Sequence, residues 1–266
     1  MNGLPQQFAR VWLVPDAGFR AERLAMAFTA AALQGRVVKD EEQTLLVRGP
    51  LPDGAPAWWK LYRVPPRRRW MTPMGRSRAR REGRALRAFA RAGVPAVPAL
   101  AWAEERRRGL LRSSLLVTAD VAGARDLRAL CADTALPPEQ RRAWLRAAGA
   151  AARRLHDAGF GHFRMQLRNL LAAEPDRILF LDAPFACAVR RAAPRPLRAV
   201  DLVDLAGADS GLGAEDSAAV LEGYGAPAPL SLHAVRARRP FSQKMRRIGW
   251  YLYYNGTGRR PDPDAA

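Results

Sequence analysis

The stretch LHDAGFGHFRMQLRNLLA, residues 155–172, constrains the fold more than any other part of the chain. It contains a polar loop and ends on a short apolar run. A second apolar run follows in ILFLDAPFA, residues 178–186, and ends on Asp182. Short apolar runs bounded by turn residues are typical of strands. The sequence therefore predicts two short strands after the loop, at 169–172 and 178–181.

A long helix is expected immediately before this loop. Pro137 and Pro138 open it, the apolar positions from Trp144 to Leu155 repeat at helical spacing, and Gly159 ends it. Further helices are expected from Ala199 to the end, where the chain finishes in a basic and aromatic tail. The C-terminal half is therefore predicted to be mainly helical.

The N-terminal half has the pattern of an antiparallel sheet with helices. An amphipathic helix is expected around 19–33, and a basic stretch leads into another at 77–91. An exposed turn, EERRRG, is expected at 104–109 between two strands. The predicted strands are 36–39, 44–48, 57–63, 97–103 and 114–121.

Composition limits the class of protein without identifying it. With 266 residues and 48% hydrophobic side chains, the chain can bury a full core in one large domain or in two lobes. Its net charge of +19 favours polyanionic partners or anionic surfaces. Only Lys39, Lys60 and Lys244 are lysines, so the arginine excess also fits a biased genome.

The remaining bulk features indicate an intracellular protein. Cys131 and Cys187 fit neither a disulfide framework nor a metal-ligand spacing. The N-terminal residues lack the pattern of a secretory signal, and no uninterrupted apolar stretch approaches a membrane span. We therefore expect a cytoplasmic location.

The order of elements resembles that of protein kinases: strands, one helix, more strands, a long helix, then a loop rich in His, Arg and Asn. This resemblance implies an α+β, bilobal protein-kinase-like fold, with an antiparallel sheet and one helix in the N-lobe and a mainly helical C-lobe. The expected lobes are residues 1–122 and 123–266, because the sequence changes to a helical pattern after Gly123.

The same resemblance assigns a nucleotide site. Lys60 lies on a predicted strand, where a kinase lysine holds phosphates, and Glu82 lies on the next helix, where it would orient that lysine. A solvated lysine and an exposed glutamate are the simpler alternative for these two residues. His162 and Asn169 match the ends of the kinase catalytic loop, and Asp182 matches the metal-binding aspartate.

These assignments imply ATP and magnesium as cofactors. Asn169 and Asp182 would hold the metal, because Mg²⁺ prefers hard oxygen ligands and bridges phosphates.

Several segments resemble the lipopolysaccharide core kinases, including heptose and Kdo kinases and their stress-induced relatives, and more distantly the small aminoglycoside-type kinases. The resemblance covers about residues 36 to 225. Asp201, in VDLVDL, then corresponds to an aspartate that supports the catalytic-loop backbone; a helix N-cap is the alternative. The other similar segments are 77–82, 92–101, 114–127 and 155–159.

The chain departs from the kinase pattern at three places. Arg164 stands where kinases place the catalytic aspartate, and a guanidinium cannot act as a base at neutral pH. Pro184 replaces the glycine of D-F-G, and VKDEEQT, residues 38–44, has no glycine for a phosphate-binding loop. Losing a general base typically costs roughly 10²–10⁴-fold in rate.

Three functions from different classes follow. The first is an ATP-dependent phosphotransferase acting on a lipopolysaccharide core sugar. The second is a pseudokinase that acts as a scaffold or regulator in envelope assembly. A nucleic-acid binder is the third, and nucleic acid is the weakest of the candidate partners because charge alone supports it.

The favoured partners are anionic. The basic runs 67–81 and 236–260 suit phosphorylated lipopolysaccharide core, lipid A or the inner face of the inner membrane, and an acidic protein is a further candidate. A solvated basic surface is the alternative explanation for both runs.

Overall fold

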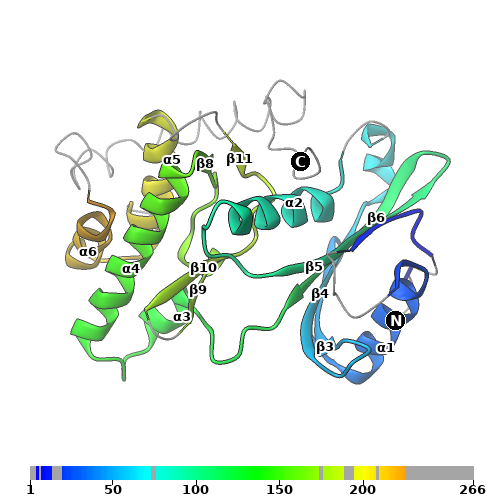
Figure 1. Cartoon of the computed structure of the whole chain (residues 1–266), viewed down its shortest axis with the longest axis horizontal. Helices are drawn as coiled ribbons and strands as arrows, with labels where there is room; N and C mark the ends of the chain where they lie inside the picture. Colours follow the sequence, from blue (N-terminus) through cyan, green and yellow to red (C-terminus); the bar gives the residue numbers. More distant parts are fainter. Residues whose placement is uncertain are drawn as a thin grey trace. The chain divides into compact units, whose positions relative to one another are not determined.

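The computed structural model describes residues 4–5, 7–13, 20–72, 76–173, 176–188, 195–207 and 210–225. The chain divides into two compact units (Figure 1). The first unit comprises residues 1–84 and 97–120, and the second comprises residues 85–96 and 121–266. Each unit is described by itself.

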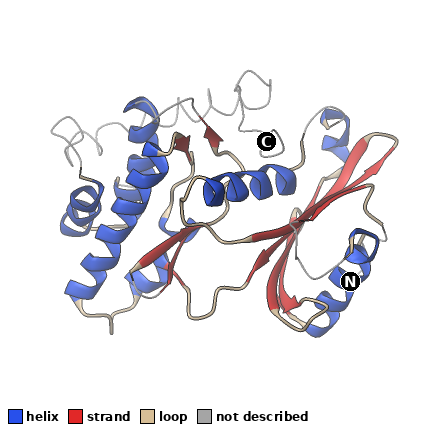
Figure 2. Ribbon diagram, viewed as in Figure 1, coloured by secondary structure: helices blue, strands red, loops and turns tan. Residues whose placement is uncertain are grey.

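The first unit is built on a six-stranded antiparallel sheet (Figure 2, red). The strand order is β1-β5-β6-β4-β3-β2, which places β4 in the interior of the sheet between β6 and β3. The strands are β1 (Arg10–Leu13), β2 (Arg36–Glu41), β3 (Thr44–Pro50), β4 (Pro56–Arg63), β5 (Ala99–Arg107) and β6 (Leu110–Ala119).

Helix α1 (Leu24–Gln34) covers part of this sheet and follows the short 3-10 helix η1 (Ala21–Arg23). Its Phe28 is fully buried, and the Phe28 ring centroid lies 6.0 Å from that of Trp59 on β4. Alternate residues of a strand point to opposite faces, so Trp59 and Leu61 both lie in the hydrophobic core between α1 and the sheet. These contacts fix the face of β4 on which Lys60 lies.

Two features of this unit differ from the sequence-based expectation. Strand β1 was not predicted, and it pairs with β5. The EERRRG segment is not an exposed turn, because β5 continues through Arg107 and only Arg108 and Gly109 form the turn, both with positive φ. Glu104 is fully buried and accepts a hydrogen bond from Arg106, so its charge is balanced inside the protein.

The other predicted elements of this region are confirmed with shifted ends. The basic stretch forms the 3-10 helix η2 (Pro66–Met71), and α2 (Arg78–Arg91) follows it. The predicted strands at 36–39, 44–48 and 57–63 correspond to β2, β3 and β4. Gly93, with a φ of 71°, lies just beyond the end of α2, as expected for a helix stop.

Helices dominate the second unit (Figure 2, blue). Its helices are α3 (Leu127–Ala132), α4 (Pro138–Asp157), α5 (Arg195–Ala206) and α6 (Ala214–Tyr224). Its strands are short: β7 (Arg125–Asp126), β8 (Phe160–Gly161), β9 (Leu170–Ala173), β10 (Arg177–Phe180) and β11 (Cys187–Ala188). They form a β10-β9-β7 sheet and a β11-β8 pair.

The long helix α4 is confirmed, and it packs closely against α6. A Cβ built on Gly149 of α4 would lie 2.0 Å from the backbone oxygen of Val220. Only glycine permits this close approach of the two helices. Helix α4 ends at Asp157, directly before the loop at 159–169.

Some sequence-based expectations lie outside the described residues. They include the C-terminal basic and aromatic tail with residues 236–260, and residues 73–75 of the basic run. Among the helices that the structure describes, none is long and apolar enough to cross a membrane.

Candidate active site

Lys60 and Glu82 form an ion pair in the first unit. The Lys60 Nζ lies 3.3 Å from Glu82 Oε1. The side chain of Glu82 is only 4% exposed and that of Lys60 is 20% exposed, so the pair is largely removed from water. A buried carboxylate needs partners, and the structure places the lysine that the sequence analysis selected beside it.

Tyr62 completes the coordination of Glu82. The Tyr62 hydroxyl donates to Glu82 Oε2 at 2.5 Å, so each carboxylate oxygen has a partner. Lys60 Nζ also lies 5.3 Å from the centre of the Tyr62 ring. Tyr62 is two residues after Lys60 on one strand, and the strand period therefore turns both side chains to the same face.

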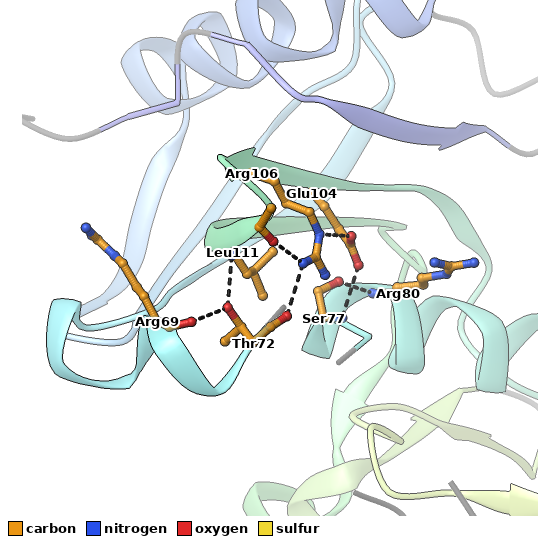
Figure 3. A network of polar contacts seen from close by, with 8 residues as sticks. Arg69, Thr72, Ser77, Arg80, Glu104, Arg106 and Leu111 are labelled. Carbon is orange, nitrogen blue, oxygen red and sulfur yellow. Dashed lines mark hydrogen bonds and ion pairs between the residues drawn. The ribbon is translucent and has the colours of Figure 1, made fainter. Parts of the chain in front are cut away.

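The start of helix α2 is fixed by a buried polar network (Figure 3). Ser77 lies just before the helix, and its hydroxyl accepts a hydrogen bond from the backbone N–H of Arg80 at 3.1 Å. This is an N-cap, which satisfies a backbone donor that the helix leaves open. The backbone N–H of Ser77 donates in turn to Glu104 Oε1 at 3.0 Å.

Arg106 holds Glu104 and connects it to the basic stretch (Figure 3). Its Nε lies 2.8 Å from Glu104 Oε2, and a second nitrogen donates to the carbonyls of Thr72 and Gly109. Burial raises the pKa of Glu104, but the hydrogen bonds from Arg106 and Ser77 outweigh it, so the net pKa is lowered. Glu104 is therefore ionised at neutral pH and anchors the start of α2.

Close packing against the sheet positions Glu82 further. A Cβ built on the neighbouring Gly83 would lie 2.4 Å from a ring carbon of Trp102. Trp102 is almost fully buried on β5, so the ring has little room to move. Glycine at this position thus lets α2 approach the sheet closely enough for Glu82 to pair with Lys60.

Asp201 supports the loop at 159–169 in the second unit. Its two carboxylate oxygens accept hydrogen bonds from the backbone N–H groups of His162 at 2.7 Å and Phe163 at 2.6 Å. Phe163 has a φ of 62°, a conformation that costs a non-glycine residue energy. Asp201 lies in the interior of α5, so it is not an N-cap and serves to hold this bend.

A second histidine and a tyrosine hold Asp201 in place. His156 Nε2 lies 3.1 Å from Asp201 Oδ2, and His156 Nδ1 lies 2.9 Å from the Tyr224 hydroxyl. His156 and Asp201 are at most 1% exposed. This buried chain links α4, α5 and α6 to the loop, so His156 has a structural role.

The loop ends where strands β9 and β10 meet. Leu170 pairs with Phe180, and the N–H of Leu181 donates to the carbonyl of Asn169 at 3.0 Å. Asp182 is the next residue, with a φ of 51°. Asn169 and Asp182 are therefore held near each other at one end of the hairpin, as the spacing of the two motifs suggested.

His162 is buried beneath this end of the hairpin. Its Nε2 lies 3.3 Å from the carbonyl oxygen of Leu181, the residue before Asp182. Burial lowers the pKa of His162, outweighing the carboxylates of Asp201 and Asp182, which raise it. The imidazole is thus neutral at pH 7 and donates no charge to the loop.

Arg164 directs its backbone, and not its side chain, toward Asn169. The Asn169 Nδ2 donates to the Arg164 carbonyl at 2.8 Å, which leaves the amide oxygen of Asn169 as the acceptor of that side chain. The guanidinium carbon of Arg164 lies 5.6 Å from the centre of the Phe185 ring. Within the described part of the chain, Arg164 forms no ion pair with Asp182.

The ligand set suits a magnesium ion shared with a substrate. Among the described residues, no three or more His, Cys, Asp and Glu side chains are grouped to hold a metal. Magnesium commonly takes only one or two protein ligands and fills its remaining positions with water and phosphate oxygens. The Asp182 carboxylate and the Asn169 amide oxygen fit such a site.

The structure thus distributes the predicted residues over both units. Lys60 is joined to Glu82 in the first unit, and His162, Arg164 and Asn169 share one loop in the second. Ser77 as a cap, Tyr62 and the Glu104–Arg106 pair were not predicted from the sequence. The period of β4 could have identified Tyr62, whereas the Glu104–Arg106 pair was obscured because its charges suggested a turn.

A family model and a solved structure match this chain. A family model described as the lipopolysaccharide kinase (Kdo/WaaP) family matches residues 60–224, from the lysine of the ion pair to the tyrosine of the buried chain. No curated protein sequence matches. A solved structure described as WaaP in complex with acyl carrier protein matches with a TM-score of 0.59 and 25% identity, covering 92% of this chain and 99% of that chain. The fold is therefore protein-kinase-like.

Proposed function

The chain belongs to the lipopolysaccharide kinase (Kdo/WaaP) family, and from this premise we propose that it transfers a phosphate group from Mg-ATP to a sugar of the lipopolysaccharide core. The observation that best supports this proposal is the buried Lys60–Glu82 pair, with Nζ and Oε1 3.3 Å apart. Such a pair orients a lysine toward nucleotide phosphates in kinases.

Each residue has a distinct task in this proposal. Lys60 binds nucleotide phosphate, and Glu82 orients it. Asn169 and Asp182 hold Mg²⁺, which neutralises charge on the transferring phosphate when bound. His162 has a positioning role, because its buried ring contacts the backbone directly before Asp182.

Arg164 determines how efficient the transfer can be. Phosphoryl transfer depends mainly on positioning and electrostatic stabilisation, so catalysis can persist without a carboxylate base. The guanidinium of Arg164, which stacks on Phe185 and has no ion-pair partner within the described residues, supplies positive charge near the end of the loop. In this proposal Arg164 stabilises phosphate and does not accept a proton.

A pseudokinase is the second candidate, and the same residue favours it. Arginine at position 164 removes the group that would accept the hydroxyl proton. Under this alternative the protein would bind nucleotide weakly or not at all and act as a scaffold or regulator in envelope assembly. A transfer assay with labelled ATP and core oligosaccharide separates the two, since only the kinase forms a phosphorylated sugar.

We also infer an acidic protein partner. The related structure is a complex with acyl carrier protein, an acidic protein, and this chain has a net charge of +19. Opposite net charges accelerate association, and this acceleration becomes smaller as the salt concentration rises. A carrier protein that copurifies or binds in low salt would support this inference.

An anionic glycolipid or membrane surface is the proposed docking site for the basic stretch. On η2, Trp70 is 71% exposed, and the neighbouring Arg67 and Arg68 are also exposed. A tryptophan beside cations is suited to a membrane interface, and each cation near an anionic surface contributes about 1 kcal/mol.

A further inference from the structure

A cavity of about 440 Å³ lies in the second unit beside the catalytic loop. Gln166, Leu167 and Arg168, all between Arg164 and Asn169 in the sequence, form one of its walls. Helices α3, α4, α5 and α6 and residues 210–212 supply the others. The volume is within the range of small-molecule sites, and none of the residues assigned above to nucleotide or metal lines it.

The lining combines donors and acceptors of the kind that recognise sugars. Arg128, Arg141 and Arg168 contribute guanidinium groups from three different elements. Asp204, Ser210 and the Gln166 amide add oxygen atoms, and Leu167 and Leu212 add apolar surface. A polyhydroxylated ring presents hydroxyl groups that need both donors and acceptors, together with C–H faces that need apolar contact.

Gln166 presents an acceptor to this cavity. Its side-chain oxygen is buried and has no hydrogen-bond partner within the described residues. Buried polar atoms are nearly always satisfied, so this oxygen is suited to accept a hydrogen bond from a donor in the cavity. A sugar hydroxyl group is such a donor.

The charge of the cavity favours an acidic ligand. Three arginines outnumber the two carboxylates, Asp204 and Asp216, and the Arg141 Nε already lies 3.3 Å from Asp216 Oδ1. Arg128 and Arg168 are exposed and have no hydrogen-bond or ion-pair partner among the described side chains. Cys131 adds no negative charge, because burial, together with Asp216, raises its pKa to about 11.

We propose that this cavity binds the acceptor, and that Arg128 and Arg168 recognise an acidic group, a phosphate or a carboxylate, on a sugar held beside the catalytic loop. The inference rests on the proposed function and adds to it the site and the chemical class of the acceptor. Arginine suits both anions, since its planar fork pairs with two oxygens at once.

Binding of a deacylated core oligosaccharide without nucleotide tests the proposal. In calorimetry, Arg168→Ala and Arg128→Ala should each weaken binding about ten- to a hundredfold, the effect of losing a charge-assisted hydrogen bond. Arg168→Lys should fall between wild type and Arg168→Ala. Arg154→Ala removes the same charge from an exposed position on α4 and should bind as wild type does. Thermal melting of every variant identifies any loss of folding. Because Arg128 and Arg168 lie on separate elements, the binding test can still be made with one alanine variant if the other does not fold.

The source of the anion is found by removing phosphate from the oligosaccharide. Lost binding identifies phosphate, and retained binding identifies the sugar carboxylate. Two results would overturn the proposal. In the first, both alanine variants bind the oligosaccharide as tightly as wild type does. In the second, wild type binds an oligosaccharide without phosphate and carboxylate groups as tightly as the intact one. Lys60→Ala separates it from the proposed function, because oligosaccharide binding should persist in that variant while phosphate transfer is lost. Binding by wild type without any transfer would refute the kinase and leave the cavity assignment standing.

Discussion

The side chain of Asn169 donates to the backbone carbonyl of Arg164 across 2.8 Å, closing the loop between them. The contact involves only the backbone at position 164, so it does not depend on which side chain stands there. Asp201 holds the preceding residues in the same way, through the backbone N–H groups of His162 and Phe163. These contacts therefore hold the shape of the loop whichever side chain stands at position 164.

This retained shape makes the lost base testable. Arg164→Asp places a carboxylate at the position where kinases have one, with the supporting hydrogen bonds intact. If the protein is the pseudokinase, the rate of phosphate transfer, measured with labelled ATP, should rise by up to about 10²–10⁴-fold; if Arg164 stabilises phosphate, the rate should fall. Arg164→Ala is the control, because it removes the guanidinium without adding a base, and it should not increase the rate. A lower rate in Arg164→Asp than in wild type would show that the guanidinium is required and that no base is missing.

Asp201→Asn should destabilise the protein. An asparagine has one acceptor oxygen, so one of the two backbone N–H groups would lose its partner and face an amide donor. An unsatisfied buried donor costs about 1–3 kcal/mol, visible in thermal or denaturant unfolding. Asp157→Asn is the matched control, since Asp157 forms half-exposed ion pairs with Arg153 and Arg198 and should cost at most about 1 kcal/mol. An equal effect of both substitutions would contradict the role of Asp201.

Glu104 should make stability depend on pH. Its folded pKa is lowered from the ordinary value of 4.5, so the folded state binds its proton less readily than the unfolded state. The contribution is fully present above pH 4.5 and is lost as the pH falls through the lower folded pKa. Melting temperatures of wild type and Glu104→Gln should therefore differ most near neutral pH and converge in acid.

The same substitution removes one partner of a buried pair, which typically costs about 3–5 kcal/mol. Glu105→Gln controls for it, because the neighbouring Glu105 is less buried and a glutamine can still accept from Ser113. If Glu104→Gln melted like wild type at pH 7, the network in Figure 3 would not anchor α2.

Trp70 and Arg68 should contribute to binding of anionic vesicles. Trp70→Ala and Arg68→Ala should each reduce cosedimentation, and wild-type binding should weaken steeply as salt rises. Leu33→Ala removes another exposed apolar side chain, 68% exposed on α1, and should have no effect. Binding that does not change with salt concentration, or that is equally strong on neutral and anionic vesicles, would argue against an electrostatic surface.

The sequence was sufficient for the elements with strong periodicity. Helix α4 and the strand that contains Lys60 were predicted because each has many regularly spaced apolar residues. The role of Asp201 stayed ambiguous between a cap and a loop support, because the sequence does not show that it lies within α5.

Tertiary partners account for what the sequence could not predict. Glu104 looked like a turn residue until the structure placed Arg106 on the same strand beside it. The acceptor cavity could not be foreseen either, because its arginines come from three distant segments and α3 is too short to show a helical period.

The most direct test of the central claim is transfer of labelled γ-phosphate from Mg-ATP to lipopolysaccharide core oligosaccharide, with acyl carrier protein present. Wild type should form a phosphorylated sugar, and Lys60→Ala and Asp182→Asn should reduce its formation by at least about 10²-fold, because they remove the phosphate and metal contacts. Arg154→Ala should be as active as wild type. No labelled sugar from wild type, or equal labelling by wild type and Lys60→Ala, would contradict the assignment of this chain as a phosphotransferase.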